Sequence, residues 1–154
     1  RCVLVAHDWG AAVAWVAAGM YPEVVERLVC LAGPHLGLAS KNMTFKQQCM
    51  SWYILFFQCP LLPELSFAHT DYAQLGGVFT KGTPIGPVTD SAFTKQDIEW
   101  YKHAFARPGV ATASINYYRA MVRCITYAPI PSVWRAIKCR LRMPVLAVMA
   151  AQDG

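Results

Sequence analysis

Short apolar runs and a helix-forming stretch alternate at the beginning of the chain. Residues 3–5 and 28–32 are continuously apolar, and residues 11–18 between them are rich in alanine and other helix formers. Continuous apolar runs of this length are typical of strands that are buried on both faces of a sheet. We interpret the polar residues 22–27 as the connection from the helix to the second strand. Because two such strands joined through one helix form a β-α-β unit, residues 1–37 predict a parallel sheet.

The hydrophobic pattern changes its period after residue 37. Between residues 38 and 140, apolar positions recur at helical spacing, and Pro and Gly residues divide the segments. Helices are expected near residues 41–58, 69–80, 94–106 and 110–123. Thr94, with Asp97 three residues later, has the spacing of a capping box and marks the beginning of the third of these helices.

The last residues return to strand character, with an apolar run at 144–149. The pattern therefore predicts an α/β fold whose parallel-sheet core comprises residues 1–37 and 141–154, with residues 38–140 inserted as a helical lid. The chain begins with Arg rather than Met, and apolar strands lie close to both ends. We interpret it as an internal fragment of a larger domain that lacks N-terminal and C-terminal parts.

Composition and charge narrow the class of protein. Of the 154 residues, 55% are hydrophobic and 15% are charged, which excludes a disordered chain. The net charge is +5, and basic residues gather at positions 135–142. We interpret this patch as a solvated basic face, with an anionic membrane surface as the alternative. No nucleic acid is expected as a partner, because no recognition motif accompanies the patch.

The cysteines and histidines give no metal or disulfide pattern. The six cysteines show no CxxC pair and no regular spacing, which favours a reduced, intracellular protein, cytoplasmic or membrane-associated. The four histidines have no partners at ligand spacing, so neither a metal nor another cofactor is expected. The longest apolar stretch, at residues 52–57, is far shorter than the ~20 residues that cross a bilayer. Association with a membrane through a preceding N-terminal segment stays open.

The most informative segment lies between the first strand and the first helix. Asp8 stands there with the small residues Ala6 and Gly10 two positions to either side. This frame is typical of a nucleophile elbow, a turn so sharp that the flanking positions must be small for strand and helix to approach. The turn also places the nucleophile at a helix N-terminus, where backbone N–H groups stabilise anions. The alternative is that Asp8 only caps the helix, since Asp is a preferred N-cap residue.

Several segments resemble the α/β-hydrolase-fold epoxide hydrolases, in the order in which that family has them. The resembling segments are the elbow His7-Asp8-Trp9-Gly10, the turn Gly33-Pro34-His35, residues 53–60 with Tyr53, residues 115–119 with Tyr118, and residues 151–153 with Asp153. Together they extend over nearly the whole chain. Haloalkane dehalogenases have a similar Asp-Trp-Gly.

The resemblance implies a role for each of these residues. Asp8 is the nucleophile, and the hydroxyls of Tyr53 and Tyr118 donate hydrogen bonds to the leaving oxygen, so the three side chains are expected to converge on one pocket. The backbone N–H of Trp9 is half of the oxyanion hole, and Asp153 is the acid that orients a general base. His7 and His35 are expected to be structural or to line the pocket. Tyr117 competes with Tyr118, because an error of one residue in the helical register exchanges them.

The implied activity is that of an epoxide hydrolase, which opens a small lipophilic epoxide through an aspartyl ester to give a vicinal diol. Four features depart from the family pattern. The upstream His-Gly-x-Pro loop and the general-base His after the acid have no counterpart, Ala6 stands where Gly is commoner, and Met149-Ala150 stands where Trp-Gly is frequent. A haloalkane dehalogenase and a non-catalytic binding protein on the same fold remain as alternatives.

Overall fold

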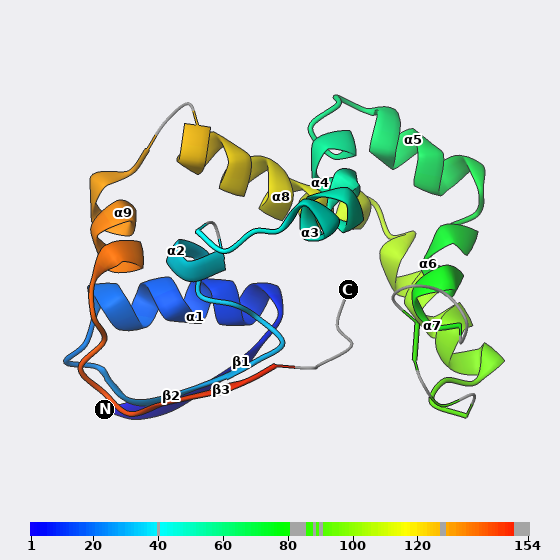
Figure 1. Ribbon diagram of the computed structural model, residues 1–154. Coiled ribbons are helices and arrows are strands. Elements are labelled where there is room, and N and C mark those ends of the chain that lie inside the picture. Colours follow the sequence, from blue (N-terminus) through cyan, green and yellow to red (C-terminus); the bar gives the residue numbers. More distant parts are fainter. Residues whose placement is uncertain (40, 81–85, 88, 90, 127–128, 150–154) are drawn as a thin grey trace. The chain divides into compact units, whose positions relative to one another are not determined.

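The fold is described from a computed structural model, which describes residues 1–39, 41–80, 86–87, 89, 91–126 and 129–149 (Figure 1). Its strands are β1 (Cys2–His7), β2 (Val25–Leu31) and β3 (Val145–Val148). Its helices are α1 (Trp9–Met20), α2 (Leu36–Ala39), α3 (Phe45–Met50), α4 (Trp52–Phe56), α5 (Leu62–His69), α6 (Ala73–Val78), α7 (Lys95–Phe105), α8 (Val110–Thr126) and α9 (Pro131–Lys138). The α/β class that the hydrophobic pattern predicts is confirmed.

The three strands form one parallel sheet, as predicted, and their order in it is β1-β2-β3. The expected start of the second strand is wrong, because β2 begins at Val25 and not at Leu28. Val25 pairs with Cys2, and its side chain is buried, so pairing and burial extend the strand into the segment that we interpret from sequence as a connection. Glu26 and Arg27 are polar because they are exposed positions of this strand.

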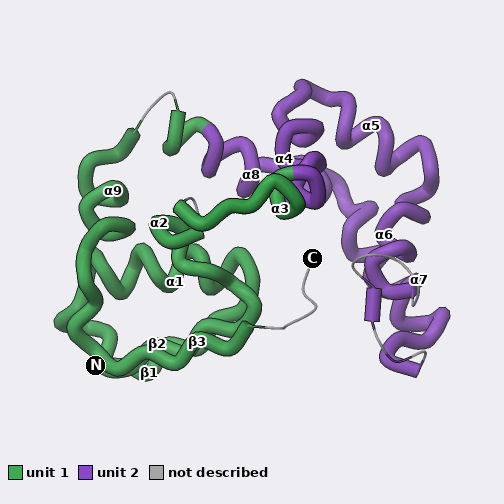
Figure 2. Tube along the Cα trace, viewed as in Figure 1, with its two compact units in different colours: residues 1–48, 123–153 green, residues 49–122, 154 purple. Residues whose placement is uncertain are grey.

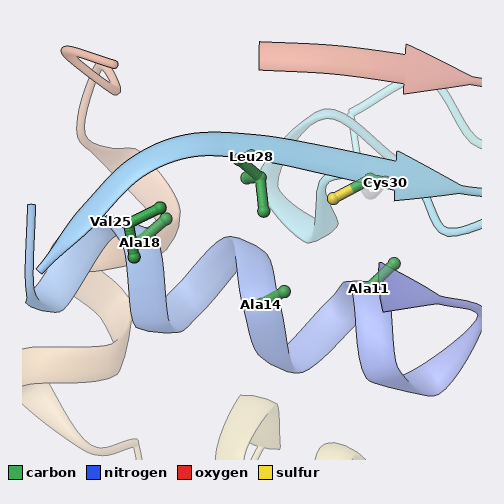
Figure 3. Packing of buried hydrophobic residues seen from close by; sticks show 6 residues of the cluster. All are labelled: Ala11, Ala14, Ala18, Val25, Leu28 and Cys30. Carbon is green, nitrogen blue, oxygen red and sulfur yellow. The ribbon is translucent and has the colours of Figure 1, made fainter. Parts of the chain in front are cut away.

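The core of the sheet region lies between β2 and α1. Figure 3 shows Val25, Leu28 and Cys30 of the strand facing Ala11, Ala14 and Ala18 of the helix. The alanines recur at intervals of three and four residues, which places them on one face of the helix. Because alanine side chains are short, α1 packs close to the strand, and Leu28 is only 1% exposed.

The helical segment contains more breaks than its pattern predicts. The helix expected at 41–58 is two helices, α3 and α4, which adjoin at Ser51. Among the described helices, the pattern misses α2, α5 and α9, and the last two have Pro in their first turn. Proline usually marks a break between segments. It is nevertheless favoured at the first position of a helix, because a backbone N–H at that position would have no partner within the helix. The helices α7 and α8 and the capping box between Thr94 and Asp97 are confirmed.

The chain divides into two compact units, shown in different colours in Figure 2. Unit 1 comprises residues 1–48 and 123–153, and unit 2 comprises residues 49–122 together with residue 154. These bounds differ from the expected limits of the lid at residues 38 and 140, because α9 packs against α1 and so belongs to unit 1. The division of the family fold into core and lid stays a prediction.

Candidate active site

Asp8 occupies the sharp turn between β1 and α1 in unit 1. Its backbone angles are φ 51° and ψ −123°, a region that residues other than glycine rarely adopt. The Asp8 N–H donates to the Leu31 carbonyl at 3.0 Å, so the end of β2 supports the turn. Backbone strain of this kind costs about 1–3 kcal/mol and persists where the surrounding structure enforces it, most often at functional sites.

The alternative that Asp8 only caps α1 is wrong. The Asp8 side chain makes no cap hydrogen bond, and its backbone is outside the extended region that N-cap residues adopt. Its side chain is exposed, while its backbone carbonyl accepts from the Ala12 N–H at 3.1 Å. Trp9, the first residue of α1, follows directly, so the exposed carboxylate stands at the positive end of a 12-residue helix.

Gly33, and not Gly10, is the small residue that the turn requires. A Cβ atom at Gly33 would lie 2.7 Å from the Asp8 carbonyl oxygen and would collide with the Ala11 Cβ. A Cβ atom at Gly10 would meet no described atom within 4 Å. The expectation that Gly10 must be small for close packing is therefore wrong within the described residues. The residue that permits the close approach lies on the segment after β2, which sequence spacing does not bring near Asp8.

Replacing Gly33 with alanine should lower the free energy of unfolding by about 2 kcal/mol, because the added methyl group overlaps backbone and side chain of the elbow. The matched control is Gly10→Ala, which should be neutral or stabilising by up to about 1 kcal/mol, since alanine favours helices. Urea unfolding followed by circular dichroism measures both variants. Equal effects at the two positions would contradict the packing argument.

His7 and His35 occupy different places in unit 1. His7 is the last residue of β1 and is exposed. His35 contacts the Trp15 ring edge to face at a centroid distance of 5.2 Å, and burial lowers the pKa of its imidazole. His35 also lines a pocket of about 640 Å³ in unit 1, whose described lining does not include Asp8. The roles of both histidines at the reaction site stay predictions.

The two candidate tyrosines come together within unit 2. The rings of Tyr53 on α4 and Tyr118 on α8 lie edge to face, with centroids 5.6 Å apart. Phe57 contacts both, at 5.6 Å from Tyr53 and 5.0 Å from Tyr118. Tyr117 is 53% exposed, whereas Tyr118 is half-buried. The helical phase therefore makes Tyr118, and not Tyr117, the ring partner of Tyr53.

Asp8 belongs to unit 1 and the tyrosine pair to unit 2, and each unit is described by itself. Asp153, the candidate acid, lies outside the described residues. The convergence of the four candidate residues on one site stays a prediction.

Other features of the described chain bear on cofactors and partners. No group of three or more His, Cys, Asp or Glu side chains among the described residues is arranged to hold a metal ion. None of the helices in the described ranges combines the length and apolar character that a membrane crossing requires. The four basic side chains of residues 135–142 are exposed, and Lys138 lies over the Trp134 ring at 5.1 Å. A membrane contact through this patch stays a prediction.

Comparisons with known proteins agree on one group of relatives, although no protein-family model matches the chain. The chain is 36% identical to human epoxide hydrolase 4 over 128 residues, which cover 81% of this chain and 35% of that protein. It is also 36% identical to the AB hydrolase superfamily protein YfhM of Bacillus subtilis strain 168 over 123 residues, covering 79% of this chain and 41% of the relative.

Among solved structures, the epoxide hydrolase CorEH shares the fold with a TM-score of 0.72 at 23% identity, over 96% of this chain and 50% of its own. The chain thus spans well under half the length of the two curated relatives, 35% and 41%. One of these relatives is named an epoxide hydrolase, the other is named an AB hydrolase, and the solved structure shares the fold of this chain. The chain belongs to the epoxide hydrolase family of the α/β-hydrolase fold.

Proposed function

We propose that this chain carries the ring-opening machinery of an epoxide hydrolase, with Asp8 as the nucleophile. The observation that supports this most directly is the strained backbone of Asp8 at the turn between β1 and α1, with an exposed side chain that makes no cap hydrogen bond. An aspartate carboxyl group is ordinarily anionic at neutral pH, so it needs no base to activate it. Serine at the same place would need one.

In the first half-reaction, a carboxylate oxygen of Asp8 attacks one ring carbon of the epoxide. A carbon–oxygen bond forms to Asp8, the bond from that carbon to the ring oxygen breaks, and the ring oxygen takes the electron pair. A tyrosine hydroxyl gives its proton to this oxygen, so the products are a hydroxyalkyl ester and a phenolate. An alkoxide is a poor leaving group, and each hydrogen bond to it in the transition state contributes about 3 kcal/mol.

Tyr53 and Tyr118 are the proposed donors to that oxygen. Their edge-to-face contact at 5.6 Å supports this assignment, because it brings two phenol rings from different helices to one place in unit 2. The apolar ring of Phe57 contacts both tyrosines, which favours a small lipophilic epoxide as substrate.

The second half-reaction hydrolyses the ester with water to give the vicinal diol. We propose the Trp9 N–H as one oxyanion donor and Asp153 as the acid that orients a histidine base. None of the four histidines follows Asp153 in this sequence, so the 154 residues carry no candidate for that base. We therefore expect the ester to accumulate on this chain.

The test is incubation of the purified chain with styrene oxide, followed by intact-mass analysis, peptide mapping and an assay for diol. A mass increase of one epoxide molecule at Asp8, without diol formation, is the expected result. Parallel incubation with a chloroalkane examines the dehalogenase alternative, which predicts chloride release instead. Binding of either compound without an ester would favour a non-catalytic protein, and repeated turnover to diol would contradict the argument about the missing base.

A further inference from the structure

The side chain of Arg119 connects the helices that carry the two candidate tyrosines. It follows Tyr118 on α8 and reaches the segment that follows α4, the helix of Tyr53. Its Nε donates to the Phe57 carbonyl and its Nη2 to the Cys59 carbonyl, both at 2.8 Å. These two carbonyls lie beyond the end of α4, where helical carbonyls have no partner within the helix.

The rest of the guanidinium is occupied by a carboxylate and an amide. Nη1 and Nη2 donate to the two oxygens of Glu64 at 2.6 Å and 3.1 Å, and Nη1 also donates to the Asn116 Oδ1 at 3.3 Å. With the two carbonyls, this makes five acceptors for the five N–H groups of an arginine. The Arg119 and Glu64 side chains are only 12% and 14% exposed, and their hydrogen bond lowers the pKa of Glu64.

Phe57 connects the hydrogen bonds of Arg119 to the two tyrosine rings. The Phe57 carbonyl accepts from Arg119, and the Phe57 ring contacts both Tyr53 and Tyr118. The Phe57 N–H in turn donates to the Tyr53 carbonyl at 2.9 Å, which ties both residues to the same helical turn. Loss of the Arg119 hydrogen bonds would therefore allow α8 to shift along the end of α4 and would change the separation of the two phenol rings.

We propose that Arg119, held by Glu64, is the positioning residue that sets the Tyr53–Tyr118 pair for proton donation to the epoxide oxygen; this inference rests on the proposed function. Arg119 acts through the tyrosines and touches no substrate. Lysine cannot replace it, because an ammonium group lacks the planar fork that serves two carbonyls and a carboxylate together.

The rates of Asp8 esterification by two electrophiles distinguish a positioning role of Arg119 from a general role in supporting the fold. Ring opening of styrene oxide by Asp8 needs a proton for the leaving oxygen. Alkylation of Asp8 by phenacyl bromide does not, because the carboxylate displaces bromide, the carbon–bromine bond breaks, and bromide leaves as the anion. The rate of ester formation at Asp8 is measured for both reagents by peptide mapping against time.

Arg119→Lys should slow esterification by styrene oxide about tenfold, by analogy with small misplacements of catalytic groups, and should change alkylation by phenacyl bromide less than about twofold. Glu64→Gln should act in the same direction with a smaller effect. The matched control is Arg123→Lys, at an exposed position one turn later on α8, which should leave both rates unchanged. Circular dichroism verifies that each variant is folded.

A second measurement reports the distance between the Phe57 and Tyr118 rings and requires no chemical reaction. Proton–proton nuclear Overhauser effects between the Phe57 and Tyr118 rings, whose centroids are 5.0 Å apart, should weaken in Arg119→Lys and persist in Arg123→Lys. Equal slowing of both reagents, or unchanged epoxide rates with unchanged ring contacts, would overturn the role of Arg119. Absence of any Asp8 ester in the unmodified chain, with the ring contacts still sensitive to Arg119, would instead refute the proposed function alone.

Discussion

Replacing Asp8 with alanine should abolish the ester that styrene oxide forms at residue 8. The carboxylate is the proposed nucleophile, and no neighbouring group in the elbow can form the same ester. The expected difference is therefore complete loss of the ester at residue 8 and not a slower rate, while adducts of the exposed cysteines are unaffected. Intact-mass analysis of both proteins after equal incubation measures it, with peptide mapping to locate the modified residue in the unmodified chain.

Asp71 provides an internal control for this experiment. It is also an exposed aspartate with a positive φ, 48° against 51° for Asp8. Its carboxylate pairs with the Lys102 Nζ at 3.1 Å, and it does not stand between a strand and a helix. Asp71→Ala should leave the labelling unchanged. An ester found on Asp71, or ester formation that survives in Asp8→Ala, would show that exposure and general reactivity account for the labelling.

Replacing Asp8 with glycine should stabilise the fold, because the strained backbone is relieved. Glycine adopts the backbone angles of Asp8 without a steric penalty, so Asp8→Gly should raise the free energy of unfolding by about 1 kcal/mol while abolishing the ester. A lower stability would argue that the Asp8 side chain supports the fold, contrary to the absence of a cap hydrogen bond.

Replacing Tyr118 with phenylalanine should slow ester formation about 100-fold, the size of effect known for loss of one oxyanion-type donor. The phenyl ring can keep the contacts with Tyr53 and Phe57, so the change is confined to the hydroxyl group. The measurement is the rate of Asp8 esterification by styrene oxide under single-turnover conditions.

Tyr117→Phe is the matched control, because it removes the same atom one position earlier on the same helix. Tyr117 is exposed and is not the ring partner of Tyr53, so its rate of esterification should stay within about twofold of the unmodified chain. A large loss in Tyr117→Phe with a normal rate in Tyr118→Phe would show that the helical register has been assigned to the wrong tyrosine. No effect in either variant would remove the main support for an epoxide over another electrophile.

Signals between near neighbours in the sequence carried the prediction of the sheet and of the elbow. The apolar runs identify β1, β2 and β3, because continuous apolar stretches are typical of strands in a parallel sheet. The expected burial holds only for β2, since β1 is mostly exposed and β3 fully exposed within the described residues. The capping box of α7 is equally local, since Thr94 and Asp97 satisfy each other's backbone. Asp8 stands out because its flanking residues and the two elements beside it are all visible within a few positions.

The sequence by itself thus determined the parallel sheet and the turn at Asp8, and the resemblance to a family pointed to the candidate tyrosines. The tertiary structure decided which residues support these features. Gly33 lies 25 positions from Asp8 and Arg119 lies 55 positions from Glu64, and neither pair has a spacing that suggests contact. The bounds of β2, the division at Ser51 and the pairing of Tyr118 with Tyr53 likewise follow from packing. Close packing and buried hydrogen bonds depend on which elements meet in space, and a one-dimensional pattern does not contain that information.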